Sequence, residues 1–132
     1  MILLTDKIDK ENKALKSITK YIMEKYNAEI DLVSLNKDTF VYIRNKKFDL
    51  LLTVCKTNKN KCVKIEEIRV TEKYRGKGIG SNILNDIMRI SKEHDCILGL
   101  WCEINNLKGY KYYTDLGFKH IETLRDHWFE YI

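Results

Sequence analysis

Three of the chain's six glycines fall within five residues, in the run Arg75-Gly-Lys-Gly-Ile-Gly-Ser81. Glycines let a backbone approach a ligand closely and turn its N–H groups toward it. Because the run lies between a predicted strand and a predicted helix, the positive end of the helix dipole adds to these amides. Arg75 and Lys77 bring positive charge to the same place. The junction is therefore suited to phosphate oxygens; alternatively, it is a turn that only packs a helix on a sheet.

Two common phosphate-binding patterns do not match this run. The P-loop pattern G-x-x-x-x-G-K-[ST] is absent from the sequence. The dinucleotide pattern G-x-G-x-x-G begins at Gly76 and Gly78 but fails, because Ser81 stands where the third glycine belongs. A P-loop site and a Rossmann site are both poor fits.

The run resembles the R/Q-x-x-G-x-G/A signature of the GNAT superfamily of N-acetyltransferases. A second element is similar to the family pattern N-x-x-A-x-x-x-Y-x-x-x-G-F, with glycine in place of the common alanine. Its matching residues are Asn106, Gly109, Tyr113, Gly117 and Phe118. The resemblance covers residues 61–123. It implies an acyltransferase that moves an acetyl group from acetyl-CoA, its cosubstrate, to a primary amine by direct attack in a ternary complex, without a metal.

The resemblance also implies where CoA binds. The edge of the strand before the loop would bind the pantetheine arm like an added strand, at a place where two parallel strands splay, near residues 68–70 and 100–102. Asn106 would hold the pantetheine or cap the helix that begins there. The implied strand residues are Ile68, Arg69 and Val70, and the implied loop residues at the pyrophosphate are Arg75, Gly76, Lys77, Gly78, Ile79, Gly80 and Ser81.

Tyr113 takes the position of the family's general acid, which protonates the departing CoA thiolate. A phenol suits this role because its pKa lies above that of a thiol. The resemblance thus implies that Tyr113 is catalytic and close to the cofactor. The alternative is a tyrosine of the hydrophobic core.

The general base is open among three glutamates. Glu66 and Glu67 lie on the strand before the loop, and Glu103 is a third candidate. Adjacent strand residues face opposite sides, so we expect at most one of Glu66 and Glu67 to point into the cleft. Glu66 shares its face with Ile68 and Val70 unless a bulge reverses this. The alternative is that these carboxylates pair with surface lysines.

Hydrophobic periodicity predicts the elements that position these residues. For example, Ile79, Ile83, Ile87 and Ile90 fall on one face of a helix with 3.6 residues per turn. The expected elements are a helix at 6–26, strands at 30–35, 40–44, 48–55 and 62–70, a helix at 79–93, a strand at 96–102, a helix at 106–115, and strands at 118–123 and 127–132. The fold class is α/β with a GNAT-like mixed sheet: an N-terminal helix and antiparallel meander, then β-α-β-α-β-β, in one domain over residues 1–132.

The ends of these elements follow from turn chemistry. Thr5 or Asp6 is expected to cap the first helix and Asn27 to end it. Gly117 follows the helix at 106–115, in the position that favours left-handed backbone. Because no glycine precedes residue 76, we expect Asn and Asp at earlier turn positions that need a positive φ.

The formal net charge of +5 helps to attract an anionic ligand or serves solubility alone. Two alternatives to the acetyltransferase stay open: a basic nucleic-acid-binding module, and a GNAT-like domain that binds CoA without catalysis. The expected partners are acetyl-CoA and an amine acceptor, either a protein or a small molecule. The expected state is a monomer or a homodimer.

No apolar run approaches the roughly 18 residues of a membrane helix, and the apolar start is too short for a signal peptide. We therefore expect a cytoplasmic protein without a membrane partner. No C-x-x-C pair occurs, so the four cysteines are expected to be buried, reduced and structural. The aromatic residues near the C-terminus are expected in the core: Trp101, Trp128, Phe129 and Tyr131.

Overall fold

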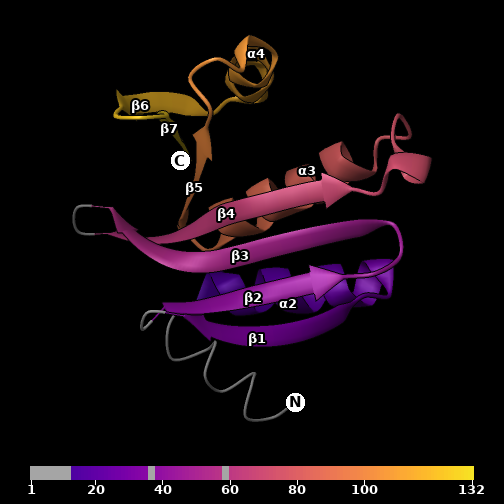
Figure 1. Ribbon diagram of the computed structural model, residues 1–132. Coiled ribbons are helices and arrows are strands. Elements are labelled where there is room, and N and C mark those ends of the chain that lie inside the picture. The colour runs from indigo at the N-terminus through magenta and orange to yellow at the C-terminus, as the bar shows by residue number, and fades with distance from the viewer. Residues whose placement is uncertain (1–12, 36–37, 58–59) are drawn as a thin grey trace.

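The computed structural model describes residues 13–35, 38–57 and 60–132 of the chain (Figure 1). Its elements, in chain order, are α2 (Lys13–Tyr26), β1 (Glu29–Leu35), β2 (Asp38–Arg44), β3 (Phe48–Thr57), β4 (Asn60–Val70), the short 3₁₀ helix η1 (Glu72–Tyr74), α3 (Ile79–Glu93), β5 (Ile97–Cys102), α4 (Leu107–Leu116), β6 (Lys119–Thr123) and β7 (His127–Tyr131). The predicted order of helices and strands is confirmed. Residues 6–12 of the first predicted helix, with the expected caps Thr5 and Asp6, lie outside the described residues.

The strands form a seven-stranded sheet in the order β1-β2-β3-β4-β5-β7-β6. The first four strands are an antiparallel meander, and β4 pairs with β5 in parallel. The hairpin β6–β7 then adds to β5 through an antiparallel β7. This is the predicted mixed sheet, an antiparallel meander followed by β-α-β-α-β-β.

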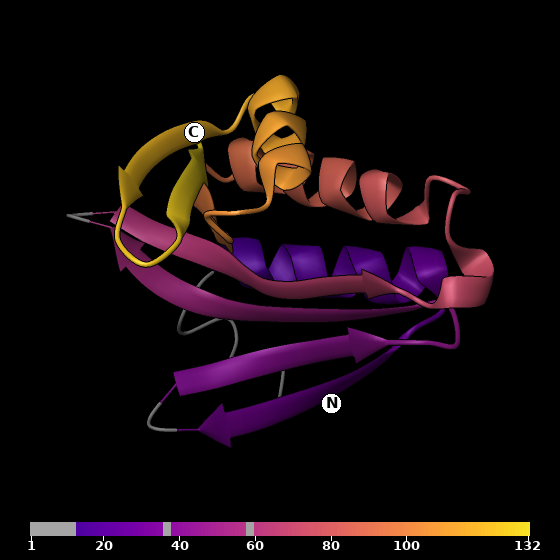
Figure 2. The same cartoon turned by 45° about the horizontal axis from the view of Figure 1, so that its top comes forward.

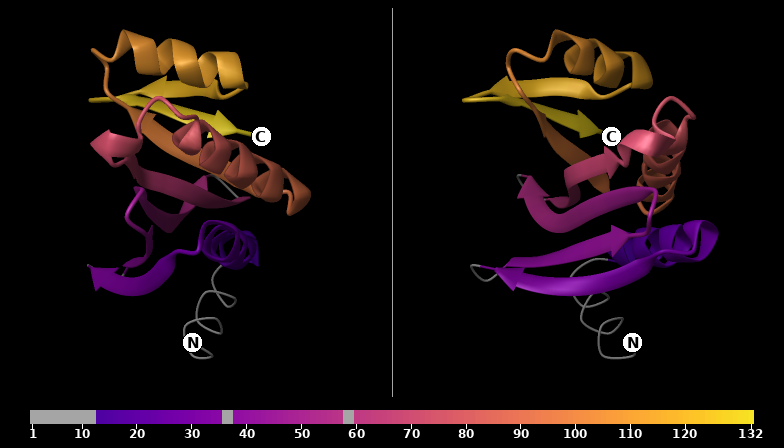
Figure 3. Two further views of the ribbon diagram at one scale, coloured as in Figure 1. Left: turned by 90° about the vertical axis from the view of Figure 1, so that its right-hand side faces the viewer. Right: turned by 45° about the vertical axis from the view of Figure 1, so that its right-hand side comes forward.

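Helices α2 and α3 lie side by side on one face of the sheet (Figures 2 and 3). Ile18 and Ile22 of α2 and Ile83 and Ile87 of α3 are fully buried in the core between helices and strands. The Asp86 carboxylate of α3 accepts hydrogen bonds of 2.9 Å from Lys25 Nζ and from the hydroxyl of Tyr26. None of the described helices is long and apolar enough to cross a membrane.

Turn residues have the expected backbone conformations. Asn27 ends α2 with a φ of 51°, and Asp95 joins α3 to β5 with a φ of 50°. Gly117 ends α4 with a φ of 106°. Polar side chains and a glycine thus occupy the left-handed region, where other residues are strained.

Two expectations about buried residues are wrong. Cys62 is disulfide-bonded, whereas Cys96 and Cys102 are buried, reduced thiols, as expected. Trp101 is 39% exposed, although Trp128 beside it in the β5–β7 ladder is buried. Alternation along β5 turns Trp101 to the sheet face opposite the helices, so no helix covers it.

Candidate active site

Strands β4 and β5 separate before either of them ends. Their parallel pairing runs from Cys62 opposite Ile97 to Ile65 opposite Leu100. Beyond this point β4 continues to Val70 without a partner in β5. The splay that the resemblance implied near residues 68–70 and 100–102 is therefore present.

A cavity of about 340 Å³ lies beside the separated end of β4. This volume is within the usual range of small-molecule sites. Its lining comes from β4, the glycine loop, α3 and α4: Ile68, Val70, Tyr74, Arg75, Gly76, Gly78, Ile79, Gly80, Ser81, Leu84, Tyr112 and Tyr113. The cavity thus joins the loop to the tyrosine that sequence reasoning singled out.

The glycine loop presents unpartnered amides to this cavity. Gly76 and Gly78 have φ values of 77° and 81°, and a Cβ atom at either would meet nothing within 4 Å. These two glycines are therefore needed for the path of the backbone. No described group accepts a hydrogen bond from the N–H groups of residues 76–81, and the first helical bond of α3 runs from Asn82 N–H to the Gly78 carbonyl. Such free amides at a helix N-terminus are suited to an anion.

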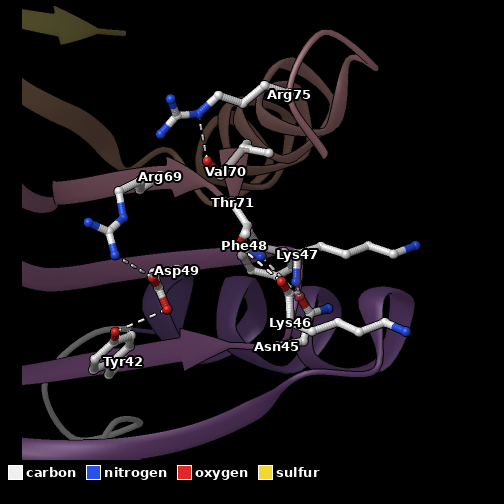
Figure 4. A network of polar contacts seen from close by, with 10 residues as sticks. All are labelled: Tyr42, Asn45, Lys46, Lys47, Phe48, Asp49, Arg69, Val70, Thr71 and Arg75. Carbon is white, nitrogen blue, oxygen red and sulfur yellow. Dashed lines mark hydrogen bonds and ion pairs between the residues drawn. The ribbon is translucent and has the colours of Figure 1, made fainter. Parts of the chain in front are cut away.

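Basic side chains lie beside the loop and leave its amides accessible. The Arg75 Nε donates a hydrogen bond of 2.9 Å to the Val70 carbonyl (Figure 4). Lys73 and Lys77 each place Nζ 5.8 Å from the centre of the Tyr74 ring. Their charges stay exposed beside the amides and add to the positive potential there.

Tyr113 reaches the cavity from α4. Its ring packs against Phe118 and Phe129, with centroids 5.7 and 5.9 Å away. Burial raises the pKa of the Tyr113 phenol, and the nearby Cys102 and Tyr112 raise it further. The hydroxyl therefore keeps its proton at neutral pH. Within the described chain it makes no hydrogen bond, so it is free to donate one to a ligand.

Tyr112 is a cavity residue that sequence reasoning did not single out. Its hydroxyl lies 2.9 Å from the Ser81 hydroxyl, so α4 and the start of α3 meet across the cavity. Tyr74 and Leu84 also line this space and were not predicted. No local signal marks Tyr112, because its partner Ser81 is 31 residues away in the chain.

Asn106 caps α4, and it is absent from the lining of the cavity. Its side-chain oxygen accepts a hydrogen bond of 2.9 Å from Gly109 N–H. A Cβ atom at Gly109 would lie within 3 Å of the Asn106 side-chain amide, so a larger residue there would require this side chain to shift. Glu103, the third candidate base, is exposed after the end of β5.

A β-bulge decides where the two candidate bases lie. Leu51 pairs with Glu67 while Leu52 pairs with Ile65, so Glu66 is an extra residue in β4. Ile65 faces the core together with Leu52, and Ile68 faces it together with Leu50. The bulge therefore turns both glutamates to the opposite sheet face.

The expectation that Glu66 shares its face with Ile68 is thus wrong. Glu66 forms an ion pair of 2.7 Å with Lys64, and both side chains are partly exposed. Glu67 is exposed and is in no ion pair with a described residue. Both carboxylates lie at the first positions beyond the last β4–β5 pair.

Arg69 also points away from the cavity. Its guanidinium lies 3.4 Å from the Asp49 carboxylate, which accepts a 3.0 Å hydrogen bond from the Tyr42 hydroxyl (Figure 4). Only the backbone of Arg69 is available to a ligand on the helix side, whereas the side chains of Ile68 and Val70 line the cavity. Within the described chain, no three His, Cys, Asp or Glu side chains gather as metal ligands.

Comparison with known proteins places the fold and the family. Residues 32–118 match the model of the acetyltransferase (GNAT) family. GCN5-related N-acetyltransferase 4, a chloroplastic protein of Arabidopsis thaliana, is 34% identical over 59 residues, which are 44% of this chain and 20% of that protein. The chain therefore spans about a fifth of the length of this relative.

Solved structures share the same fold. Arabidopsis thaliana Naa50, in complex with the bisubstrate analogue CoA-Ac-MVNAL, has a TM-score of 0.54 at 24% identity over 70% of each chain. Arabidopsis thaliana NAA60, in complex with acetyl-CoA, has a TM-score of 0.55 at 15% identity over 71% of this chain and 76% of that chain. Because the family model also spans the splayed strands, the glycine loop and Tyr113, this chain belongs to the acetyltransferase (GNAT) family.

Proposed function

We propose that the chain transfers an acetyl group from acetyl-CoA to a primary amine, by direct attack within a ternary complex. One observation carries this proposal. A single cavity brings together the free amides of the glycine loop, the unpaired end of β4 and Tyr113. The pyrophosphate, the pantetheine arm and the departing thiolate of CoA would each use one of these three features.

The residues fit acetyl-CoA. The amides of residues 76–81 and the α3 dipole suit the pyrophosphate oxygens. The backbone of β4 beyond Ile65 offers its free edge to the amides of the pantetheine arm, and Ile68 and Val70 supply apolar contacts. Acetyl-CoA bound there would supply a thioester carbonyl open to a nucleophile.

Tyr113 would act as the general acid. Its buried phenol remains protonated at neutral pH, because burial raises its pKa. Its hydroxyl makes no hydrogen bond within the described chain and lies in the cavity with the loop. Tyr113 can therefore hold a proton for the sulfur that leaves as CoA.

A glutamate would remove the proton of the acceptor on the other side of the sheet. A lysine-like amine has a pKa of about 10.4, so freeing it at pH 7 costs about 4.6 kcal/mol. Glu66 and Glu67 lie on the sheet face opposite the helices, at the point where β4 and β5 separate. The amine would approach from this face while CoA leaves on the helix side.

Thermal unfolding with and without acetyl-CoA tests the cofactor site. Ligand at 100 times its dissociation constant adds about 2.7 kcal/mol, which raises Tm by roughly 5–15 °C. We expect this rise in the wild type and not in Gly78→Glu. Leu124→Glu is the matched control, because it makes the same change of charge at an exposed residue of the β6–β7 turn, far from the loop (Figure 2).

Release of CoA in the presence of a panel of amines tests transfer. We expect at least one primary amine to release CoA with the wild type, with its acetylated product identified by mass. Tyr113→Phe should bind acetyl-CoA but release CoA slowly. The absence of a Tm rise with acetyl-CoA, CoA and longer acyl-CoAs would overturn the proposed function.

A further inference from the structure

A second cavity, of about 850 Å³, lies between the end of α2, the β2–β3 turn and the first residue of α3. Ile79 lines both this cavity and the one assigned to acetyl-CoA. The two spaces are otherwise lined by different residues. The proposed acetyl transfer makes no use of the larger one.

The lining of the larger cavity is strongly cationic. It contains Lys25, Arg44, Lys46 and Lys47, against one carboxylate, that of Glu29. Lys25 is paired with Asp86 at 2.9 Å, and Arg44 lies 3.7 Å from Asp31. Lys46 and Lys47 form no ion pair with a described residue, so two ammonium groups are available to a ligand.

The backbone that carries these two lysines is held on both sides. On the α2 side, the Asn45 side chain accepts hydrogen bonds from Lys47 N–H at 2.7 Å and from Phe48 N–H at 3.1 Å, and donates one of 2.9 Å to the Tyr26 carbonyl. On the side of the glycine loop, Thr71 is the partner. Its hydroxyl donates to the Lys46 carbonyl at 2.9 Å, and its N–H donates to the Lys47 carbonyl at 2.8 Å (Figure 4).

These hydrogen bonds fix the backbone positions of Lys46 and Lys47. Figure 4 shows both of them leaving the turn in the same direction, away from the sheet. A site whose backbone is already ordered loses less entropy when a ligand binds. The free lysines are thus presented as a pair in a rigid frame.

We propose that this cavity binds a small molecule that carries two or more phosphate groups, while acetyl-CoA occupies its own cavity. Lysine ammonium groups bind phosphate as point charges with three donors each. The cations come from α2 and from the β2–β3 turn and line a hollow of small-molecule size, whereas nucleic-acid sites form a basic stripe or patch on the surface. The Glu29 carboxylate can accept a hydrogen bond from a hydroxyl of the same ligand.

The 3′-phosphate of CoA is an alternative ligand for these lysines. Lys47 Nζ lies 5.7 Å from the centre of the Tyr74 ring, and Tyr74 lines the acetyl-CoA cavity. A contact of Lys47 with CoA would make the basic cavity part of the cofactor site. The experiment must therefore separate a free polyphosphate from the cofactor.

The probe is inorganic tripolyphosphate, titrated by calorimetry into the full chain with and without saturating acetyl-CoA. With saturating acetyl-CoA we expect one tripolyphosphate per chain. Without acetyl-CoA the free amides of the glycine loop form a second anion site, so the binding that persists at saturation is the one assigned to the basic cavity. The double variant Lys46→Glu/Lys47→Glu should bind at least about tenfold more weakly, because two charged hydrogen-bond donors become acceptors. The matched control Lys108→Glu/Lys119→Glu changes the net charge equally at exposed residues of α4 and β6 and should bind like the wild type.

Three outcomes would overturn the proposal. The first is loss of tripolyphosphate binding once acetyl-CoA is saturating, which would mean one shared site. The second is a double variant that loses affinity for CoA but not for dephospho-CoA, which would assign the lysines to the 3′-phosphate. The third is tighter, salt-sensitive binding of a short RNA than of tripolyphosphate. Failure of acetyl-CoA to bind at all would contradict the proposed function alone, because tripolyphosphate is also titrated without it.

Discussion

Alanine at two glycines of the same loop should have different effects on stability. Gly78 has a φ of 81° and a ψ of 7°, and a Cβ atom there would meet nothing within 4 Å. The cost of Gly78→Ala is therefore conformational, about 1–2 kcal/mol for an L-residue in left-handed backbone. A smaller gain of about 0.4–1 kcal/mol, from the restricted unfolded chain, offsets part of it.

Gly80→Ala is the matched variant. Gly80 lies inside α3 with an ordinary φ, and a Cβ atom there would lie 3.4 Å from Val70 Cγ2, in van der Waals contact. Alanine is favoured over glycine by about 0.8–1.0 kcal/mol in a helix interior, and at Gly80, the second residue of α3, the gain is at most this large. We therefore expect Gly80→Ala to be as stable as the wild type or slightly more stable.

Urea unfolding of both variants measures the difference. The two free energies of unfolding should differ by about 1–2 kcal/mol in favour of Gly80→Ala. A chain of this length should then show Tm values that differ by roughly 3–10 °C. Calorimetry with acetyl-CoA should show the larger loss of affinity in Gly78→Ala, because its strain displaces the loop amides. Equal stability of the two variants, or a less stable Gly80→Ala, would refute the assignment of the left-handed conformation to Gly78.

Further predictions concern the cap, the acid and the base. Asn106→Ala should lower the free energy of unfolding in urea by about 1 kcal/mol, since it removes the cap of α4, whereas Asn105→Ala should not. Tyr113→Phe should lower kcat by about 10²–10⁴-fold in an assay of CoA release and leave the dissociation constant of acetyl-CoA unchanged. Because burial raises the pKa of Tyr113, its contribution to the free energy of unfolding is present below about pH 10 and is lost at higher pH. Above about pH 10, the free energy of unfolding in urea should therefore fall less steeply in Tyr113→Phe than in the wild type. Glu67→Gln should lower kcat more than Glu66→Gln, because Lys64 already pairs with Glu66; the reverse order would assign the base to Glu66.

Much of the fold follows from patterns within a few residues. Four isoleucines at helical spacing predict α3, which spans Ile79–Glu93. Asn27 and Gly117 end their helices because their backbones tolerate a positive φ. The glycine loop and the cap at Asn106 are equally local, since each depends on the chain within a turn of itself.

The sheet face on which the candidate bases lie could not be predicted from such local patterns. Alternation along a single strand puts Glu66 and Ile68 on one face. The bulge opposite Leu51 and Leu52 adds one residue to β4, so that Glu66 lies with Glu67 on the other face. A bulge is a property of two strands in register, so the sequence of β4 alone could not reveal it.

What the sequence determined by itself is the order of the elements and the residues that must bend, cap or present amides, because these depend on neighbours along the chain. The tertiary structure decided which distant residues share a space. It brought Tyr112 to Ser81 in the cavity beside β4, and Lys25 to Lys47 in the basic cavity. The physical reason is that such contacts depend on strand register and on the packing of helices against the sheet, which only the whole folded chain defines.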